Sequence, residues 1–104
     1  MTIAPKIAVI GEFRLPAGAF DDARPVMRTM LEATRAEEGC ISYAFAQDVL
    51  DPDLVRISEV WESLEHLGAH AATAHMAGWR AALGRIGISG RSVVSYVIAS
   101  ERAV

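Results

Sequence analysis

The stretch CISYAFAQDVLDPDLVRISEVWE (Cys40–Glu62) predicts two strands joined by a turn, and it decides the class of fold. Segments 40–48 and 54–62 are rich in β-branched and aromatic residues, which favour strands. Between them, Pro52 supplies the fixed φ angle of a turn position. Two strands this close along the chain predict an antiparallel hairpin, and the other segments must be arranged around it.

The segments before this hairpin follow a strand pattern and then a helix pattern. Segment 6–15 predicts a strand, and the spacing of apolar residues predicts a helix from Phe20 to Thr34. Asp21 or Asp22 is expected to cap the start of this helix. Gly39 suits a left-handed residue after its end.

Two helices and a last strand are predicted after the hairpin. Ser63 is expected to cap a short helix whose buried stripe is Leu64, Leu67 and Ala71. A longer helix is predicted from the apolar residues between Met76 and Ile86, and Gly84, Gly87 and Gly90 are expected to end it. Segment 91–100 is predicted to be the last strand. The order β-α-β-β-α-α-β predicts a ferredoxin-like α+β fold, in which one antiparallel sheet carries helices on one face. We expect one domain, residues 1–104, because a chain of this length builds a single core.

Several of the predicted strands are apolar on both faces. In the last strand, Val93 and Val97 alternate with Val94 and Tyr96. The helices of so short a chain cover only one face of the sheet, so the other face needs a partner. The sequence therefore predicts a homodimer that forms through the sheet faces.

The composition argues against several classes of partner. A net charge of −3 without a basic cluster disfavours nucleic acid. Although 52% of the residues are hydrophobic, no run approaches the ~18 apolar residues of a membrane helix. The first residues lack the pattern of a signal peptide, and the single cysteine, Cys40, fits a reducing compartment. We expect a cytoplasmic protein that binds neither nucleic acid nor membranes.

Several short pieces, in their order and spacing, resemble the antibiotic biosynthesis monooxygenase (ABM) family. The pieces are the turn Glu38-Gly39-Cys40 running into Ser42-Tyr43, the turn Asp51-Pro52, the strand end Glu59-x-Trp61, and His70 with His75 beyond it. The resemblance spans Ile7 to about Val97. It implies a dimeric α+β barrel with a pocket between the sheet and the helices of each subunit. Some members oxidise quinols or polycyclic phenols there with O2 and without a metal or organic cofactor. Others degrade haem, process small signalling sugars or have no known activity, so the fold leaves the function open.

All three histidines of the chain lie within the ten positions from His66 to His75. His66 and His70 are about one helical turn apart and are placed to share a metal ion. His75 is rotated by about 140° from His70 if one helix runs through both, so it does not join them. With no third ligand assigned, no metal site is expected.

His70 is the candidate general base. It is expected at the edge of the buried stripe, where its imidazole reaches a pocket beneath the helices, whereas His66 turns toward solvent. An imidazole, with an ordinary pKa of about 6.5, removes a phenolic proton near neutral pH. Glu59 is expected to be the second catalytic residue and the partner of His70. The structural alternative is that His70 only ties the short helix to a strand.

The candidate substrate-binding residues are aromatic: Trp61, Tyr43, Trp79 and Tyr96. The first three are expected to wall a pocket, and the Tyr96 hydroxyl is expected to bind a substrate oxygen. Core filling and structural hydrogen bonding are the alternatives. The chain contains no asparagine, and the resemblance implies that haem-degrading members use one from the first strand. Haem is therefore disfavoured, and no cofactor is expected.

The resemblance, taken together with these residues, implies a cofactor-independent monooxygenase that acts on a quinol or polycyclic phenol with O2. The partner is then a small aromatic or apolar molecule. Two alternatives stay open: a non-catalytic dimer that binds or senses a small ligand, and an isomerase of a small metabolite on the same scaffold.

Overall fold

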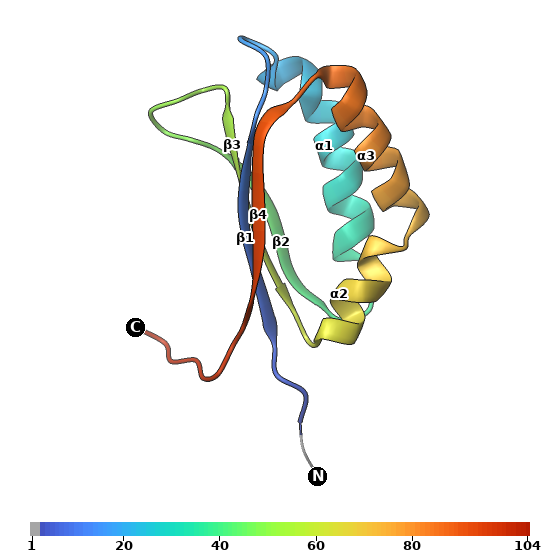
Figure 1. Ribbon diagram of the computed structural model, residues 1–104, viewed down its shortest axis with the longest axis vertical. Helices are drawn as coiled ribbons and strands as arrows, with labels where there is room; N and C mark the ends of the chain where they lie inside the picture. Colours follow the sequence, from blue (N-terminus) through green and yellow to red (C-terminus); the bar gives the residue numbers. More distant parts are fainter. Residues whose placement is uncertain (1–2) are drawn as a thin grey trace.

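The computed structural model describes residues 3–104 and shows one antiparallel sheet with the helices on one of its faces (Figure 1). The elements in chain order are β1 (Ile7–Arg14), α1 (Phe20–Arg35), β2 (Cys40–Gln47), β3 (Leu54–Trp61), α2 (Leu64–Ala71), α3 (Ala74–Ile86) and β4 (Ser89–Val97). The predicted order of elements and the ferredoxin-like α+β class are confirmed.

The strands lie in the order β2-β3-β1-β4, and every neighbouring pair is antiparallel. The predicted hairpin is the β2–β3 pair, in which Tyr43 lies opposite Glu59. Glu59 in turn lies opposite Val9 of β1. These three side chains are buried and form one row across the sheet on the face that the helices cover. This row places one carboxylate inside the layer between sheet and helices.

The start of α1 differs from the prediction. Asp21 and Asp22 lie in the first turn, and the capping position is Ala19, which makes no side-chain hydrogen bond. The prediction that either aspartate caps the helix is therefore wrong. Both carboxylates still favour the helix because its N-terminus carries a partial positive charge.

Hydroxyl side chains cap the other two helices. The predicted cap Ser63 is confirmed, since its Oγ accepts a hydrogen bond from the backbone N–H of His66. Thr73 caps α3, which begins earlier than the apolar pattern predicted. Gly87, with φ of +83°, ends α3, whereas Gly84 lies inside the helix and does not break it.

The buried face of α2 is not the predicted stripe. Leu64 is 65% exposed and Ala71 is exposed, whereas His70 is only 3% exposed. His70 therefore does not lie at the edge of a buried stripe: it is the buried residue of this helix. This helix thus turns an imidazole into the core, beside the partly buried Leu67 of the predicted stripe.

The sheet face away from the helices is partly apolar, as predicted. Ile10, Val94 and Tyr96 are each about half exposed there. Within residues 3–104, no helix combines the length and the apolar character needed to cross a membrane.

Candidate active site

A carboxylate and two imidazoles meet where the end of α1 approaches the junction of α2 and α3. Glu37 Oε2 lies 2.6 Å from Nδ1 of His70 and 2.8 Å from Nε2 of His75. The His70 side chain is nearly fully buried, that of Glu37 is mostly buried, and that of His75 is one quarter exposed. We call Glu37, His70 and His75 the histidine–carboxylate cluster.

The turn after α1 positions Glu37. The backbone N–H of Glu37 donates to the carbonyl of Thr34, and Cys40 closes the turn onto Glu37. Gly39 has a φ of +80°, so the predicted left-handed residue is confirmed. A Cβ at this position would also collide with the ring of His66. The turn is therefore fixed both by a backbone angle that favours glycine and by the neighbouring helix.

The break between α2 and α3 brings the two histidines together. Two hydrogen bonds of Thr73 stabilise this junction. Its hydroxyl donates to the carbonyl of His70 and accepts from the backbone N–H of Met76. The change of direction places the rings of His70 and His75 at 6.0 Å, centre to centre. The premise that His75 points away from His70 is therefore wrong, because the helix does not run through both residues.

The hydrogen bonds of the cluster fix which ring nitrogens are free. An ionised carboxylate oxygen only accepts, so both ring nitrogens that touch Glu37 Oε2 donate. For a neutral His70 this leaves Nε2 as the acceptor, and for a neutral His75 it leaves Nδ1. One carboxylate thus selects the tautomer of both rings.

Glu59 is buried near His70 but is not its hydrogen-bond partner. Its Oε1 accepts from Nε1 of Trp61 at 2.9 Å, and His70 bonds to Glu37 instead. Burial raises the pKa of Glu59; the Trp61 hydrogen bond and the charges of His70 and Arg91 oppose this rise without cancelling it. Glu59 therefore acts on His70 through its charge and not through contact.

Two of the four predicted aromatic residues surround His70. The Trp61 ring lies 4.7 Å and the Tyr43 ring 5.6 Å from the imidazole, centre to centre. Trp61 is fully buried and fills the core. Burial, reinforced by the charge of Glu59, raises the pKa of Tyr43, so its hydroxyl stays neutral. The His70 imidazole and these two rings form one packed unit.

The other two aromatic residues lie elsewhere. Trp79 stacks on Phe45, with ring centres 5.1 Å apart. Tyr96 is 53% exposed and lies on the opposite face of the sheet, so one chain does not bring it to His70. His66 also stays apart, because its Nδ1 pairs with Ser63 Oγ at 2.7 Å.

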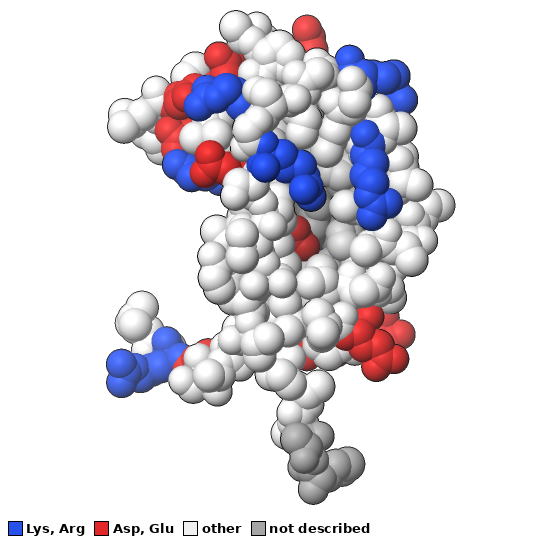
Figure 2. Space-filling view, in the orientation of Figure 1, with Lys and Arg blue, Asp and Glu red and all other residues white. Residues whose placement is uncertain are grey.

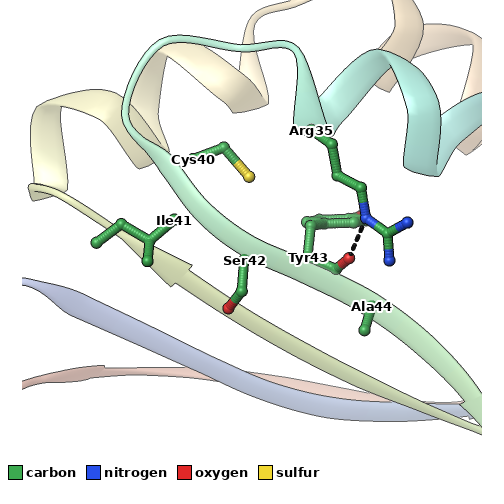
Figure 3. A pocket seen from close by; sticks show the side chains of 6 residues that line it. All are labelled: Arg35, Cys40, Ile41, Ser42, Tyr43 and Ala44. Atoms are coloured by element: carbon green, nitrogen blue, oxygen red, sulfur yellow. Dashed lines mark hydrogen bonds between the residues drawn. The ribbon is translucent and has the colours of Figure 1, made fainter.

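Two grooves border this region. One, of about 230 Å³, lies between α1 and α3, and its lining is apolar except for Thr29 and His75; the lining residues are Val26, Thr29, Met30, His75, Gly78 and Trp79. The other, of about 420 Å³, lies along β2 (Figure 3), where Arg35 Nε donates to the carbonyl of Tyr43 at 2.8 Å. Among these and the other surface cavities described for residues 3–104, none has His70 in its lining. Only His75 connects the cluster to a groove.

The surface also shows a hollow between the β4 edge and the helices (Figure 2). An acidic side chain lies at the bottom of this hollow, and basic side chains lie along its upper rim. The hollow leads toward the layer that contains the row of Tyr43 and Glu59. Cys40 lies in the groove along β2 instead. Burial, reinforced by Glu37 and Glu59, raises the pKa of its thiol, which disfavours a nucleophilic thiolate.

Comparison with known proteins places this architecture in a family. The family model described as "Antibiotic biosynthesis monooxygenase" matches residues 6–82, which include the whole histidine–carboxylate cluster. The chain belongs to the antibiotic biosynthesis monooxygenase family. The predicted family resemblance is thereby confirmed.

Similar solved structures share the fold, and a curated relative matches part of the sequence. A structure from Deinococcus radiodurans, assigned provisionally to the antibiotic biosynthesis monooxygenases, has a TM-score of 0.88 and 21% identity, over 94% of this chain and 97% of that one. A protein of Mycobacterium tuberculosis has a TM-score of 0.83 and 26% identity, over 94% and 99%. An uncharacterized protein of Synechocystis is 30% identical over 64% of this chain. The chain spans about half of that relative, 46% of its length.

Sequence reasoning missed Glu37 and left His75 out of the candidate site. Glu37 drew no attention because Glu37-Glu38-Gly39 reads as a helix end. Thr73 carried a usable signal: a threonine just before a helical run is a common cap, and it indicates a new helix start between His70 and His75.

Proposed function

We propose that this ABM-family protein is a cofactor-independent monooxygenase that oxidises a quinol or polycyclic phenol with O2. His70 is its general base or substrate orienter. The observation that carries this proposal is the 2.6 Å hydrogen bond between Glu37 and Nδ1 of the buried His70. A carboxylate on one ring nitrogen fixes the tautomer and leaves the other nitrogen to accept a proton, as in other acid–base sites.

The surroundings of His70 suit a phenolic substrate. Trp61 and Tyr43 offer aromatic faces beside the imidazole. Glu59 and Glu37 supply negative charge that stabilises the imidazolium formed when His70 takes a proton. Because His70 is 3% exposed, the substrate must reach Nε2 through the layer between sheet and helices, toward which the hollow in Figure 2 leads.

The reaction needs no external reductant. Loss of the phenolic proton to His70 gives an electron-rich anion, and this anion transfers electrons to O2. For an anthrone-like phenol, one oxygen atom then replaces the two hydrogens of the methylene carbon as a carbonyl, and the other oxygen atom leaves as water. The base is regenerated when its proton goes to the departing oxygen.

The dimer is part of the same proposal. Ile10, Val94 and Tyr96 on the outer sheet face are the surface through which a second copy of the chain packs. Tyr96 then belongs to the contact between subunits and not to the site of its own chain. The cytoplasmic location stays a prediction from composition.

A second candidate is a non-catalytic dimer that holds a small apolar ligand. The groove between α1 and α3 favours it, because that groove is mostly apolar and has Trp79 and His75 in its wall. A ligand there contacts the cluster without needing access to His70.

Oxygen consumption with a panel of hydroquinones and anthrone-like phenols, in the presence of EDTA and without added flavin, tests the proposal. His70→Ala should lower turnover by about 10²- to 10⁴-fold, the usual contribution of a positioned base. His66→Ala is the matched control, because it removes an imidazole from the same helix outside the cluster. Equal rates for wild type and His70→Ala would refute the catalytic role. No turnover across the panel, together with tight binding of an aromatic ligand, would support the second candidate.

A further inference from the structure

The histidine–carboxylate cluster has the donor atoms of a metal site, although the sequence led us to expect none. Glu37, His70 and His75 each offer a ligand atom within 4.8 Å of the others, and Glu37 Oε2 already contacts Nδ1 of His70 and Nε2 of His75. We propose that these three atoms bind a divalent transition-metal ion such as Zn²⁺, and that this ion inhibits the enzyme. Binding rests on the geometry alone, whereas inhibition rests on the proposed function.

The distances suit an ion of this size. Zinc lies about 2.0–2.2 Å from nitrogen and oxygen ligands, so tetrahedral ligand atoms are roughly 3.3 Å apart. Glu37 Oε2 lies 2.6 and 2.8 Å from the two ring nitrogens, because a shared hydrogen now separates each pair. Small side-chain rotations therefore admit the ion, with no rearrangement of the helices.

The donor set selects the kind of metal. Two imidazoles and one carboxylate suit zinc and the late first-row metals, whereas Mg²⁺ and Ca²⁺ prefer oxygen ligands alone. Three protein ligands also leave one position of a tetrahedral ion open, as in catalytic zinc sites. His75 is one quarter exposed in the wall of the α1–α3 groove, which gives the ion an entry path.

The ligands are already held in place. The Trp61 and Tyr43 rings pack around His70, and Thr73 fixes the backbone between the two histidines. The metal thus needs little ordering of the protein, which favours affinity.

Metal binding prevents His70 from acting as a base, although the imidazole keeps the same number of protons. A neutral His70 that gives the Nδ1 lone pair to the metal must carry its proton on Nε2. The Nε2 atom then donates instead of accepting, so it takes no proton from a phenol. The ion also holds Glu37 and neutralises its charge.

Titration of the full, untagged chain with Co²⁺ tests binding without any substrate. We expect one Co²⁺ per chain with visible absorption bands of a four- or five-coordinate ion, and displacement by one equivalent of Zn²⁺. Glu37→Gln and His75→Gln should weaken binding by more than roughly 100-fold, since even supporting residues of metal sites contribute 10- to 100-fold. His66→Gln should bind like wild type, and circular dichroism of each variant checks that it is folded.

Several results would overturn the proposal. Absence of Co²⁺ bands at millimolar metal, or equal binding by wild type, Glu37→Gln and His75→Gln, would refute the site. If Zn²⁺ binds but raises O2 consumption over that in EDTA, the inhibitory role is wrong. If the metal binds and no phenol is oxidised with or without EDTA, the proposed function fails while the metal site stands.

Discussion

Replacement of Glu37 tests whether the hydrogen bonds of the histidine–carboxylate cluster stabilise the fold. Glu37→Ala removes the only hydrogen-bond partner described for Nδ1 of His70, and this nitrogen stays buried beneath α2. A buried donor left without a partner costs about 1–3 kcal/mol. His75 is one quarter exposed, so water replaces its lost partner at a cost of less than about 1 kcal/mol. The two costs together should lower the free energy of unfolding by about 1–4 kcal/mol.

Glu37→Gln should be milder than Glu37→Ala. The amide oxygen, placed where Oε2 now lies, still accepts from both ring nitrogens. We expect a loss of about 1 kcal/mol, because the bonds are no longer charge-assisted. The order wild type, Gln, Ala is the signature of a hydrogen-bonded role.

Urea unfolding, followed by tryptophan fluorescence, measures both variants. Trp61 lies beside His70 and Trp79 in the adjoining groove, so the signal reports on this region. Glu38→Ala is the control, since its side chain is exposed and its loss should change stability by less than about 0.5 kcal/mol. If Glu37→Ala and Glu38→Ala were equally stable, the cluster would not hold the helices together, and the argument from buried hydrogen bonds would fail.

Three further predictions address other parts of the molecule. Because burial raises the pKa of Glu59 in the folded state, the folded protein binds this proton more tightly, and the free energy of unfolding should fall as pH rises from the ordinary glutamate pKa through the raised one. Glu59→Gln should remove this part of the pH dependence in unfolding curves, and an unchanged slope would contradict it. Gly39→Ala should lower the free energy of unfolding by about 1–3 kcal/mol, because alanine is strained at a φ of +80° and its Cβ meets His66. In a double-mutant cycle, the additional change His66→Ala should recover the part of this loss that is due to the collision, whereas additive losses would rule out the contact. Sedimentation at micromolar concentration should give twice the chain mass, and Ile10→Asp on the outer sheet face should give monomers; a monomeric wild type would refute the proposed interface.

The local predictions succeeded where neighbouring residues decide the structure. The hairpin, the Ser63 cap and the left-handed Gly39 depend on turn chemistry within a few residues, and all three are confirmed. The prediction that an aspartate caps α1 failed because the helix begins at Phe20, so both aspartates lie inside its first turn.

The candidate site was predictable only in part. The sequence singled out His70 as the histidine that turns inward, but it assigned Glu59 as the partner because that carboxylate lies on a strand beside Trp61. In the fold, the indole N–H of Trp61 donates to Oε1 of Glu59. Glu37, in a turn 33 residues before His70, forms the hydrogen bond to the imidazole instead. Spacing along one helix cannot show such a contact.

The sequence by itself determined the order of strands and helices, their apolar faces and the family, because these follow from short-range periodicity and from motif order. The tertiary structure alone decided the chemistry of the cluster. Thr73 bends the chain between the two histidines, and the turn at Gly39 swings Glu37 beneath them. One carboxylate oxygen of Glu37 then contacts His70 and His75, which follow it by 33 and 38 positions. Packing of the helices on the sheet brings these side chains together, because it sets the direction of each helix after the turn that precedes it.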